Sequence, residues 1–540
     1  MLSGASGGDN DTMRTLGMGL LRGTGSLGKR WLVAMSLLAG CTAITGGDLR
    51  GGIGSRCEKD ADCHASSCFD GLCSRRCSAD LDCPKPAICL SPDTGSGRGG
   101  QCHLPLSVTA FYIGVGTAQE GWSLTHHEGL LAAQKQLGYL RGGPQGSPNG
   151  IAFGYKDLVF PEAIASEVAT AVAGGAELII ANSFSHRDAV LQVARQYADR
   201  PVRFLTCAGF EVQPPNVGSY FGYMEQAWYV AGRTSALKAS ATSPRLGFIG
   251  SFITPEVVRH INAFARGAQS VKPGSIVEVR WLGFWFDYNA QPTFSYKASF
   301  MPTAQMLYAE ELLTAQLIEA GAEVIAHQAD NQRPVQKVHE WLGNGLISGV
   351  FSLGNDNRYA CYSQGPGGTR GAAYRGCLGS AYWNWGPLYS RILDDIHRQT
   401  WQASNIVEPL SSNAALSVAG FELTPELGDP AALAVAIQST VNAGPSAVFA
   451  GPLRTTGQRA DLPAGQSIRY DPTDPNKQQE WRTLCWFVQG LVQKSDPNDP
   501  QSADEAALVP DGSMALPPGR VLLSPPGLPT GQGLSCKGNV

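Results

Sequence analysis

Two successive series of alternating apolar strands and amphipathic helices run through the chain from residue 107 onward. The first series starts with the apolar strand VTAFYIGVG at 108–116, and the second starts with RLGFIGSF at 245–252. Strands that alternate with helices form parallel sheets covered by helices on both faces. Each series is long enough for one doubly wound sheet. The sequence therefore predicts an α/β protein with two similar lobes and a ligand cleft between them.

The remaining elements follow at short intervals. We expect strands at 176–183, 202–209, 323–330 and 348–356 and helices at 121–138, 186–198, 310–321 and 334–342. A further helix opens with Pro255 in a first-turn position. Its residues Val258, Ile261, Ala265 and Ala268 recur at the spacing of a buried helical face.

The segment WLGFWFD at 281–287 places three aromatic residues and a carboxylate at the end of a predicted strand. Ligands of open α/β sheets bind at the carboxyl ends of strands. An aromatic ring there can stack on a flat ligand, and an acid can accept hydrogen bonds from it. The alternative is that these aromatics belong to the core. Other polar residues at strand ends, each alternatively a cap or loop residue, are Asn182, Ser183, Asp330, Asp356 and Asn384.

The overall composition argues against a nucleic-acid partner. The 540 residues carry a net charge of −4, whereas nucleic-acid binders normally present a basic face. The sequence contains no convincing catalytic triad, metal-ligand helix or dinucleotide loop. We therefore expect a small-molecule ligand, no cofactor, no metal and no enzymatic activity.

The N-terminal segment resembles an export signal. Lys29 and Arg30 precede the apolar run WLVAMSLLAG and then Cys41. This arrangement is typical of a bacterial lipoprotein signal over residues 1–41, with Leu38–Cys41 as its lipobox. We expect lipid on Cys41, so that acyl chains anchor the mature protein to a membrane and it faces the periplasm or the exterior. The Gly-rich residues 42–56 would form a flexible linker.

Eight of the fourteen cysteines lie in a short module at 57–102. CEKDADC at 57–63 recurs as CSADLDC at 77–83, and each copy is followed by two more cysteines. In an exported chain such a cluster predicts disulfides, whose connectivity the sequence leaves open. Zinc bound by four cysteines and weak calcium binding by the acidic turns are the alternatives. The module's disulfide candidates are Cys57, Cys63, Cys68, Cys73, Cys77, Cys83, Cys89 and Cys102.

Five cysteines remain outside the module. Cys361 and Cys377 bracket a Gly-rich loop that a disulfide could close, and Cys485 could pair with Cys536. Cys207 lies on a predicted buried strand and is expected to be a core thiol. Residues 493–540 are rich in Pro, Gly and Ser and are expected to form a C-terminal tail.

Several separated motifs, in order, are similar to those of the basic membrane lipoprotein family. They are EGWSLTHHEG at 120–129, PNVGSYFGY at 215–223, HINAFARGAQSVKPG at 260–274, WFD at 285–287, AVFAGPL at 447–453 and CWFVQGL at 485–491. This family comprises substrate-binding proteins of ABC transporters, several of which capture purine bases or nucleosides. The resemblance implies a type I periplasmic-binding-protein fold over residues 107–492, two hinged lobes that close on the ligand, and an ABC permease and ATPase as partners.

The resemblance also implies roles for individual residues. Trp122 and Trp285 fall where the family has aromatics that stack on the base, and Asp356 falls on its acidic loop. Gln119 and Ser123 replace an acid and an asparagine, and Trp383 replaces the lysine of nucleoside binders, which favours a free base or another ring. Trp383 and Trp385 are alternatively hinge packing. The candidate ligand-binding residues are Trp122, Ser123, Asn182, Ser183, Trp285, Asp287, Asp330, Asp356, Trp383 and Asn384.

The sequence thus predicts a lipid-anchored solute-binding protein of an ABC importer that captures a purine base or nucleoside. The alternative is a ligand-sensing or adhesion lipoprotein that uses the same fold without transport.

Overall fold

The computed structural model describes most of the chain between residues 57 and 506. The described ranges are 57–103 (without 65, 70–71, 79, 85–86 and 91–99), 106–140 (without 118–120), 151–452 (without 252–253, 287–290, 365–369, 398, 414 and 425–428), 455–456, 463, 466, 484, 487–489, 491–494 and 504–506. The predicted signal, Cys41, the linker, Gln119, Asp287, Cys485 and Cys536 lie outside them. Within these ranges, no helix combines the length and apolar character needed to cross a bilayer.

The cysteine-rich module consists of short strands joined by four disulfides. Strands β1 and β2 pair with each other, and β5 pairs with β3 and β4. Each repeat links its first cysteine to its third and its second to its fourth, so that sulfur atoms that could have bound zinc are joined to one another. The disulfides are Cys57–Cys68, Cys63–Cys73, Cys77–Cys89 and Cys83–Cys102. The strands are β1 (Ser67–Phe69), β2 (Leu72–Ser74), β3 (Arg76–Cys77), β4 (Ile88–Leu90) and β5 (Gly100–His103).

The aspartates of the repeats stabilise their own turns. Asp62 accepts hydrogen bonds from the backbone N–H groups of Glu58 and Lys59. Asp82 accepts from the backbone N–H of Ser78 in the equivalent position of the second repeat. These bonds hold the pKa of Asp62 below its usual value. The recurring acids therefore have a structural role in the two turns.

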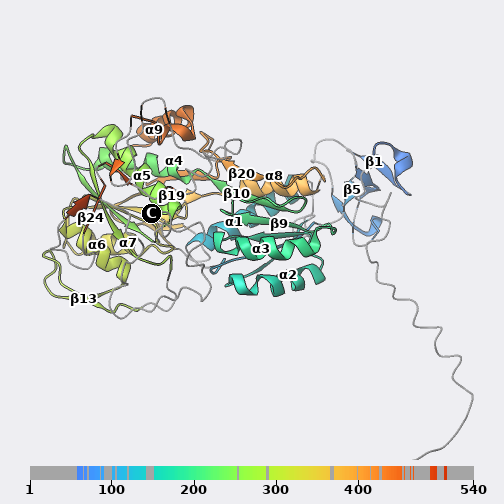
Figure 1. The fold of residues 1–540 in the computed structure, drawn as a ribbon, viewed down its shortest axis with the longest axis horizontal. Coiled ribbons are helices and arrows are strands. Elements are labelled where there is room, and N and C mark those ends of the chain that lie inside the picture. The colour runs from blue at the N-terminus through green and yellow to red at the C-terminus, as the bar shows by residue number, and fades with distance from the viewer. Residues whose placement is uncertain are drawn as a thin grey trace, which may run out of the picture. The chain divides into compact units, whose positions relative to one another are not determined.

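The first lobe contains a six-stranded parallel sheet in the order β7-β6-β8-β9-β10-β20. Helices α1 and α8 cover one face, and α2 and α3 cover the other (Figure 1). The strands are β6 (Leu106–Phe111), β7 (Ile151–Lys156), β8 (Leu178–Ala181), β9 (Arg203–Cys207), β10 (Val217–Gly222) and β20 (Asn405–Glu408). The helices are α1 (Trp122–Leu140), α2 (Ile164–Ala173), α3 (Arg187–Ala194) and α8 (Gly386–His397).

The second lobe contains an eight-stranded sheet in the order β21-β19-β16-β15-β11-β12-β24-β25. Its two edge strands, β21 and β25, are antiparallel to their neighbours. The strands are β11 (Arg245–Gly250), β12 (Ile276–Trp281), β15 (Val324–His327), β16 (Phe351–Asp356), β19 (Cys377–Trp383), β21 (Ala419–Leu423), β24 (Leu491–Lys494) and β25 (Asp504–Ala506). The helices are α4 (Met224–Lys238), α5 (Pro255–Val271), α6 (Ala309–Glu319), α7 (Arg333–Gly343) and α9 (Pro430–Ala443).

Buried residues of the second sheet alternate between its two faces. Phe248 packs with α4 and α5, whereas Ile249 packs with α6 and α7. Helices α4 and α5 pack closely because glycines occupy their crossing. A Cβ added to Gly232 would lie 2.0 Å from the Phe264 carbonyl oxygen, and one added to Gly267 would lie 2.0 Å from that of Tyr229.

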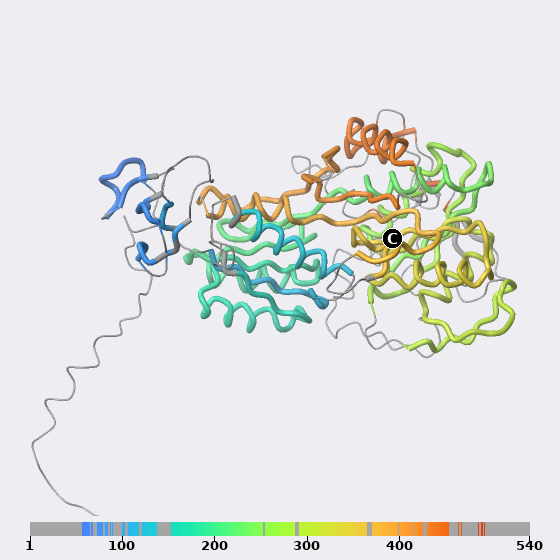
Figure 2. Tube along the Cα trace, turned by 180° about the vertical axis from the view of Figure 1, so that it is seen from behind, coloured from blue at the N-terminus to red at the C-terminus, as the bar shows by residue number. Residues whose placement is uncertain are grey.

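The chain passes between the two sheets three times. Strand β10 leads through Tyr223 into α4, β19 leads through Asn384 and Trp385 into α8, and β20 leads into β21. The tube view in Figure 2 shows these connections from behind. Two doubly wound lobes joined by three crossings form a type I periplasmic-binding-protein fold, as predicted.

Two features of the second lobe were not predicted. The sheet continues beyond residue 492, since β24 pairs with β12 and β25 pairs with β24, so the expected start of the tail at 493 falls inside a strand. A hairpin of β13 (Phe294–Tyr296) and β14 (Gln305–Leu307) also precedes α6. A short strand at a sheet edge carries too few residues for a clear alternating pattern.

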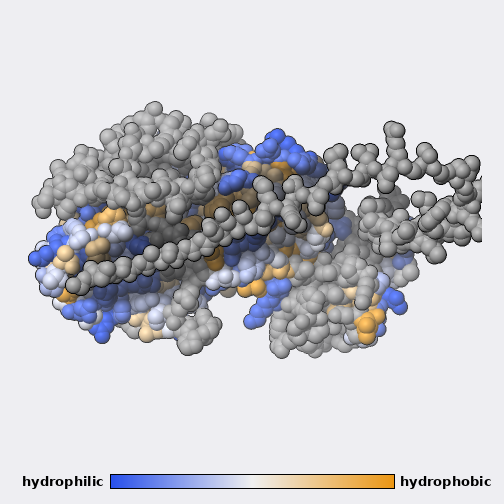
Figure 3. All heavy atoms as spheres, turned by 90° about the horizontal axis from the view of Figure 1, so that it is seen from below, coloured by the Kyte–Doolittle hydropathy of each residue, from blue (hydrophilic) through white to orange (hydrophobic). Residues whose placement is uncertain are grey.

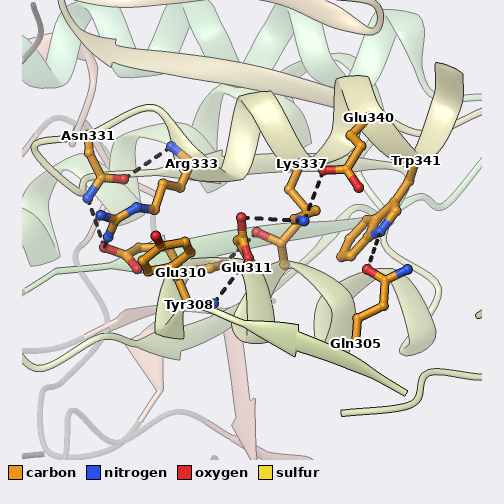
Figure 4. A network of polar contacts seen from close by, with 10 residues as sticks. Gln305, Tyr308, Glu310, Glu311, Asn331, Arg333, Lys337, Glu340 and Trp341 are labelled. Atoms are coloured by element: carbon orange, nitrogen blue, oxygen red, sulfur yellow. Dashed lines mark hydrogen bonds and ion pairs between the residues drawn. The ribbon is translucent and has the colours of Figure 1, made fainter. Parts of the chain in front are cut away.

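Polar contacts connect the hairpin region, α6 and α7 (Figure 4). Buried Glu310 pairs with Arg333 at 3.1 Å and accepts a hydrogen bond from Asn331 at 2.8 Å. The Trp341 indole N–H of α7 donates to Gln305 of β14 at 3.2 Å. The contacts of Glu310 join α6 to the start of α7, and the indole hydrogen bond fixes the hairpin to α7.

Removing the Cys361–Cys377 disulfide is expected to destabilise the second lobe. The bridge closes 16 residues between two buried cysteines. By the loop-entropy relation, replacing both residues with alanine should lower the free energy of unfolding by about 3 kcal/mol. Denaturant unfolding of the double variant measures this change. A midpoint equal to that of the unsubstituted protein would show that the bridge contributes no stability.

Candidate functional site

An aromatic cluster lies where α1 of the first lobe meets the crossing segment after β19. Here "aromatic cluster" means Trp122, His126, Trp383 and Trp385. The Trp122 ring meets those of Trp383 and Trp385 edge to face, at 5.6 and 5.7 Å. Trp385 stacks on Trp383 at 4.6 Å on one side and on His126 at 4.6 Å on the other.

The members of this cluster differ in how much surface they leave open. Trp385 is completely buried, and Trp383 is 5% exposed. Trp122 is half-buried. Edge-to-face and stacked arrangements are the favourable geometries for aromatic pairs. Trp385 is thus a packing residue of the hinge, whereas Trp122 presents surface that a ligand could contact.

Polar strand-end residues fix the position of Trp122. Its indole N–H donates to the Asn182 carbonyl oxygen at 2.6 Å. The Asn182 side chain donates to Ser123 Oγ and accepts from the Ile113 N–H, and Ser123 Oγ also accepts from the Gly114 N–H. Ser123 and Asn182 therefore tie the loop after β6 to the end of β8.

Two other candidate residues form backbone contacts. Ser183 accepts a hydrogen bond from the Ser185 N–H and caps the turn that follows β8. Asn384 lies in a crossing segment, where its side chain donates to the Ser417 carbonyl oxygen at 3.0 Å. Both residues thus have structural functions at the ends of strands.

The loops carrying Trp122 and Trp285 meet through Asp330. Gly121 has a φ of +100°, and a Cβ added there would lie 2.7 Å from the Asp330 carbonyl oxygen. The Asp330 N–H donates to the Trp285 carbonyl oxygen at 3.0 Å. The structure therefore brings Trp122 of one lobe and Trp285 of the other to the same interlobe region.

Asp356 connects the aromatic cluster to charged residues. It ends β16 with a φ of +61°, is buried, and receives a hydrogen bond from the Trp383 side chain. Burial and the nearby Glu256 carboxyl raise the pKa of Asp356 above its usual range, and the hydrogen bond from Trp383 opposes this. Asp356 therefore lies at the end of a central strand. Its protonated, neutral form is more favoured than that of an ordinary aspartate.

A pocket opens between the lobes near this acid. Its lining residues come from the loops after β8 and β9 and from the start of α5: they are Phe184, Ala208, Phe210, Thr254, Pro255, Glu256 and Arg259. Burial raises the pKa of Glu256 to about 7, with Arg259 lowering it and Glu225 raising it further.

The pocket residues were not among the sequence candidates. Glu256 and Arg259 lie three residues apart on a helix, a spacing that usually marks a solvated face. Here α5 is buried almost all round, and Arg259 is only 2% exposed. One feature of the sequence could have identified these two residues, namely that a pair of opposite charges stands on the helix, otherwise largely buried, that follows strand 245–252.

Comparison with known proteins identifies the family. Residues 108–407 match the family model Bmp, described as ABC transporter substrate-binding protein, PnrA-like. A Haloferax volcanii protein, TsgA13, named as an ABC transporter glucose-binding protein, is 28% identical over 283 residues, which are 52% of this chain and 59% of that protein. The match thus spans less than two thirds of that relative.

Two further proteins extend the comparison. A purine-binding protein of Brucella abortus is 24% identical over 68% of this chain and 90% of its own. A solute-binding protein structure from Conexibacter woesei aligns with 63% of this chain and 95% of its own, at 16% identity and a TM-score of 0.45. Since the family model covers more than half of the residues, the chain belongs to the Bmp family of PnrA-like ABC transporter substrate-binding proteins.

Proposed function

We propose that this substrate-binding protein captures a purine base or nucleoside between its lobes. The observation that carries the proposal is the half-buried ring of Trp122, fixed by Asn182 and facing the interlobe region that also contains Trp285. Stacking of a base on an aromatic side chain contributes on the order of 1 to 3 kcal/mol. Asp287, Asp330 and Asp356 would bind the polar edge of the ring.

The relatives support two ligand classes. One is named for purine binding and the other for glucose binding. A sugar also has an apolar face that packs on an indole, so the aromatic cluster alone does not separate the two. Trp383 at the position where nucleoside binders have a lysine favours a free base over a nucleoside.

We further propose that Cys41 carries lipid and that the mature protein is anchored outside the cytoplasm, where it delivers its ligand to an ABC permease and ATPase. The five disulfides of the described chain are consistent with an oxidising compartment. Metabolic labelling with a radioactive fatty acid, compared between the unsubstituted protein and Cys41→Ser, tests the anchor. Label in both proteins would place the lipid elsewhere.

On the face in Figure 3, hydrophilic and hydrophobic residues are interspersed. Exposed large apolar residues such as Leu237 of α4 and Leu416, in the segment between β20 and β21, lie on different parts of the chain. Single exposed apolar residues are normal for protein surfaces and do not define an interface.

A ligand panel tests the proposed function. Adenine, guanine, hypoxanthine, their nucleosides and glucose would be added to the mature protein while tryptophan fluorescence and the melting temperature are recorded. A ligand at a hundredfold its dissociation constant should stabilise the fold by about 2.7 kcal/mol. A response to glucose alone would contradict purine capture. No response at all would favour the sensing or adhesion function, with the cysteine-rich module as the binding part.

A further inference from the structure

Two acids, Glu256 and Glu225, lie beside one arginine, Arg259, and a third acid, Asp356, lies beside Glu256. Glu256 and Arg259 line the pocket from the first turn of α5. Glu225 of α4 and Asp356 of β16 complete the group, which we call the acidic cluster. Glu225 is 1% exposed and Arg259 2% exposed, while Glu256 keeps partial contact with solvent through the pocket.

The charges of the acidic cluster do not balance. If every group were ionised, the cluster would hold three carboxylates but one guanidinium, which interacts with Glu225 and Glu256; burying a charge without full compensation is costly. Burial and, to a lesser extent, neighbouring acids raise the pKa values of Glu256 and Asp356, while Arg259 opposes this at Glu256 and the Trp383 hydrogen bond opposes it at Asp356. Tyr223 faces Arg259 from the start of α4. At neutral pH the group retains protons that a ligand could displace.

Building on the proposed function, we propose that the acidic cluster selects a ligand that is neutral or cationic and carries N–H or O–H donors, with Glu256 as its specificity-determining residue. A donor aimed at Glu256 stabilises the ionised carboxylate, so the proton leaves on binding. A phosphorylated ligand would bring negative charge to a site that already carries excess acid, and would be disfavoured.

The pH dependence follows from this exchange. Free Glu256 is largely protonated below about pH 7, and bound donors lower its pKa. The affinity for a donor-bearing ligand should therefore rise as the pH increases towards 7 and level off above it. Lowering the pH instead forces the complex to retain the proton and weakens binding.

Titration calorimetry of the mature protein tests the inference. The probes are adenine, adenosine, adenosine monophosphate and glucose, each measured at about pH 5.5 and 7.5 in two buffers of different ionisation enthalpy, a design that detects proton release. The test variant is Glu256→Gln, which keeps the shape and removes the charge. The matched control is Glu162→Gln, because Glu162 is exposed and lies outside the pocket.

We expect adenine or adenosine to bind about tenfold more tightly at the higher pH and to release up to one proton, as one linked group allows. Adenosine monophosphate should bind at least about a hundredfold more weakly than adenosine. Glu256→Gln should flatten the pH profile and remove this proton release, whereas Glu162→Gln should match the unsubstituted protein. The melting temperature of each variant confirms that it is folded.

Two results would overturn the inference and leave purine capture intact: equal binding of the monophosphate, or an unchanged pH profile in Glu256→Gln. If glucose alone binds, the proposed function fails. In that case the inference stands only if Glu256→Gln changes the glucose profile in the same way. Absence of binding by all four probes overturns both.

Discussion

Replacing Trp122 with alanine is expected to weaken binding of a purine base by about 10- to 100-fold. Base stacking on an aromatic side chain contributes on the order of 1 to 3 kcal/mol, and each 1.4 kcal/mol is a factor of ten. The substitution also removes the hydrogen bond from the indole to the Asn182 carbonyl oxygen. Calorimetry with adenine measures the effect.

Trp122→Phe provides the matched control for this prediction. Phenylalanine retains one aromatic ring at the start of α1 and loses the N–H donor together with the second ring of the indole. We expect its affinity to stay within about tenfold of the unsubstituted protein, since one neutral hydrogen bond contributes about 1 kcal/mol. If Trp122→Ala bound adenine as tightly as the unsubstituted protein, the ring of Trp122 would not contact the ligand.

Replacing Gly232 with alanine is expected to destabilise the second lobe more than most single methyl additions. The new Cβ would lie 2.0 Å from the Phe264 carbonyl oxygen, well inside van der Waals contact. Relief requires α4 and α5 to separate, and both are buried over much of their surface. Overpacking of a core costs about 1 to 3 kcal/mol and occasionally more, and we expect the upper end here. The melting temperature should fall by several degrees.

Gly343→Ala is the control for this substitution. Gly343 ends α7, and a Cβ added there would have no atom within 4 Å outside its own helix and chain neighbours. Alanine is more favourable than glycine in a helix by roughly 0.5 to 1 kcal/mol, so this variant should melt at the same temperature or slightly higher. An equal melting temperature for Gly232→Ala would mean that α4 and α5 adjust without loss of packing.

The elements of the fold could be predicted from the sequence because strands and helices leave local patterns. Strand 245–252 and the helix from Pro255 appear in the structure as β11 and α5. The pairing of distant segments leaves no such pattern. Strand β20 joins the first sheet beside β10 although the second lobe separates them in the chain.

In the candidate site, too, local patterns could be predicted from the sequence and tertiary contacts could not. Trp285 and Asp356 could be singled out because unusual side chains stand at the ends of predicted strands, and Trp122 because its motif resembles that of the family. The contact of Trp122 with Trp383 depends on how α1 packs against the crossing segment, which is a tertiary property. Glu256 and Arg259 became site residues only because helix packing buries a pair of charges that would otherwise be solvated.

The three crossings also have a consequence for how the chain acquires its structure. Helix α8 and strand β20 complete the first lobe, yet they follow most of the second lobe in the sequence. Until α8 and β20 have been synthesised and have docked, the edge of β10 and the face of α1 that packs against α8 remain uncovered. Unpaired strand edges promote association with other chains. An N-terminal fragment that stops before α8 should therefore aggregate, because the first lobe is completed only by segments that follow most of the second lobe.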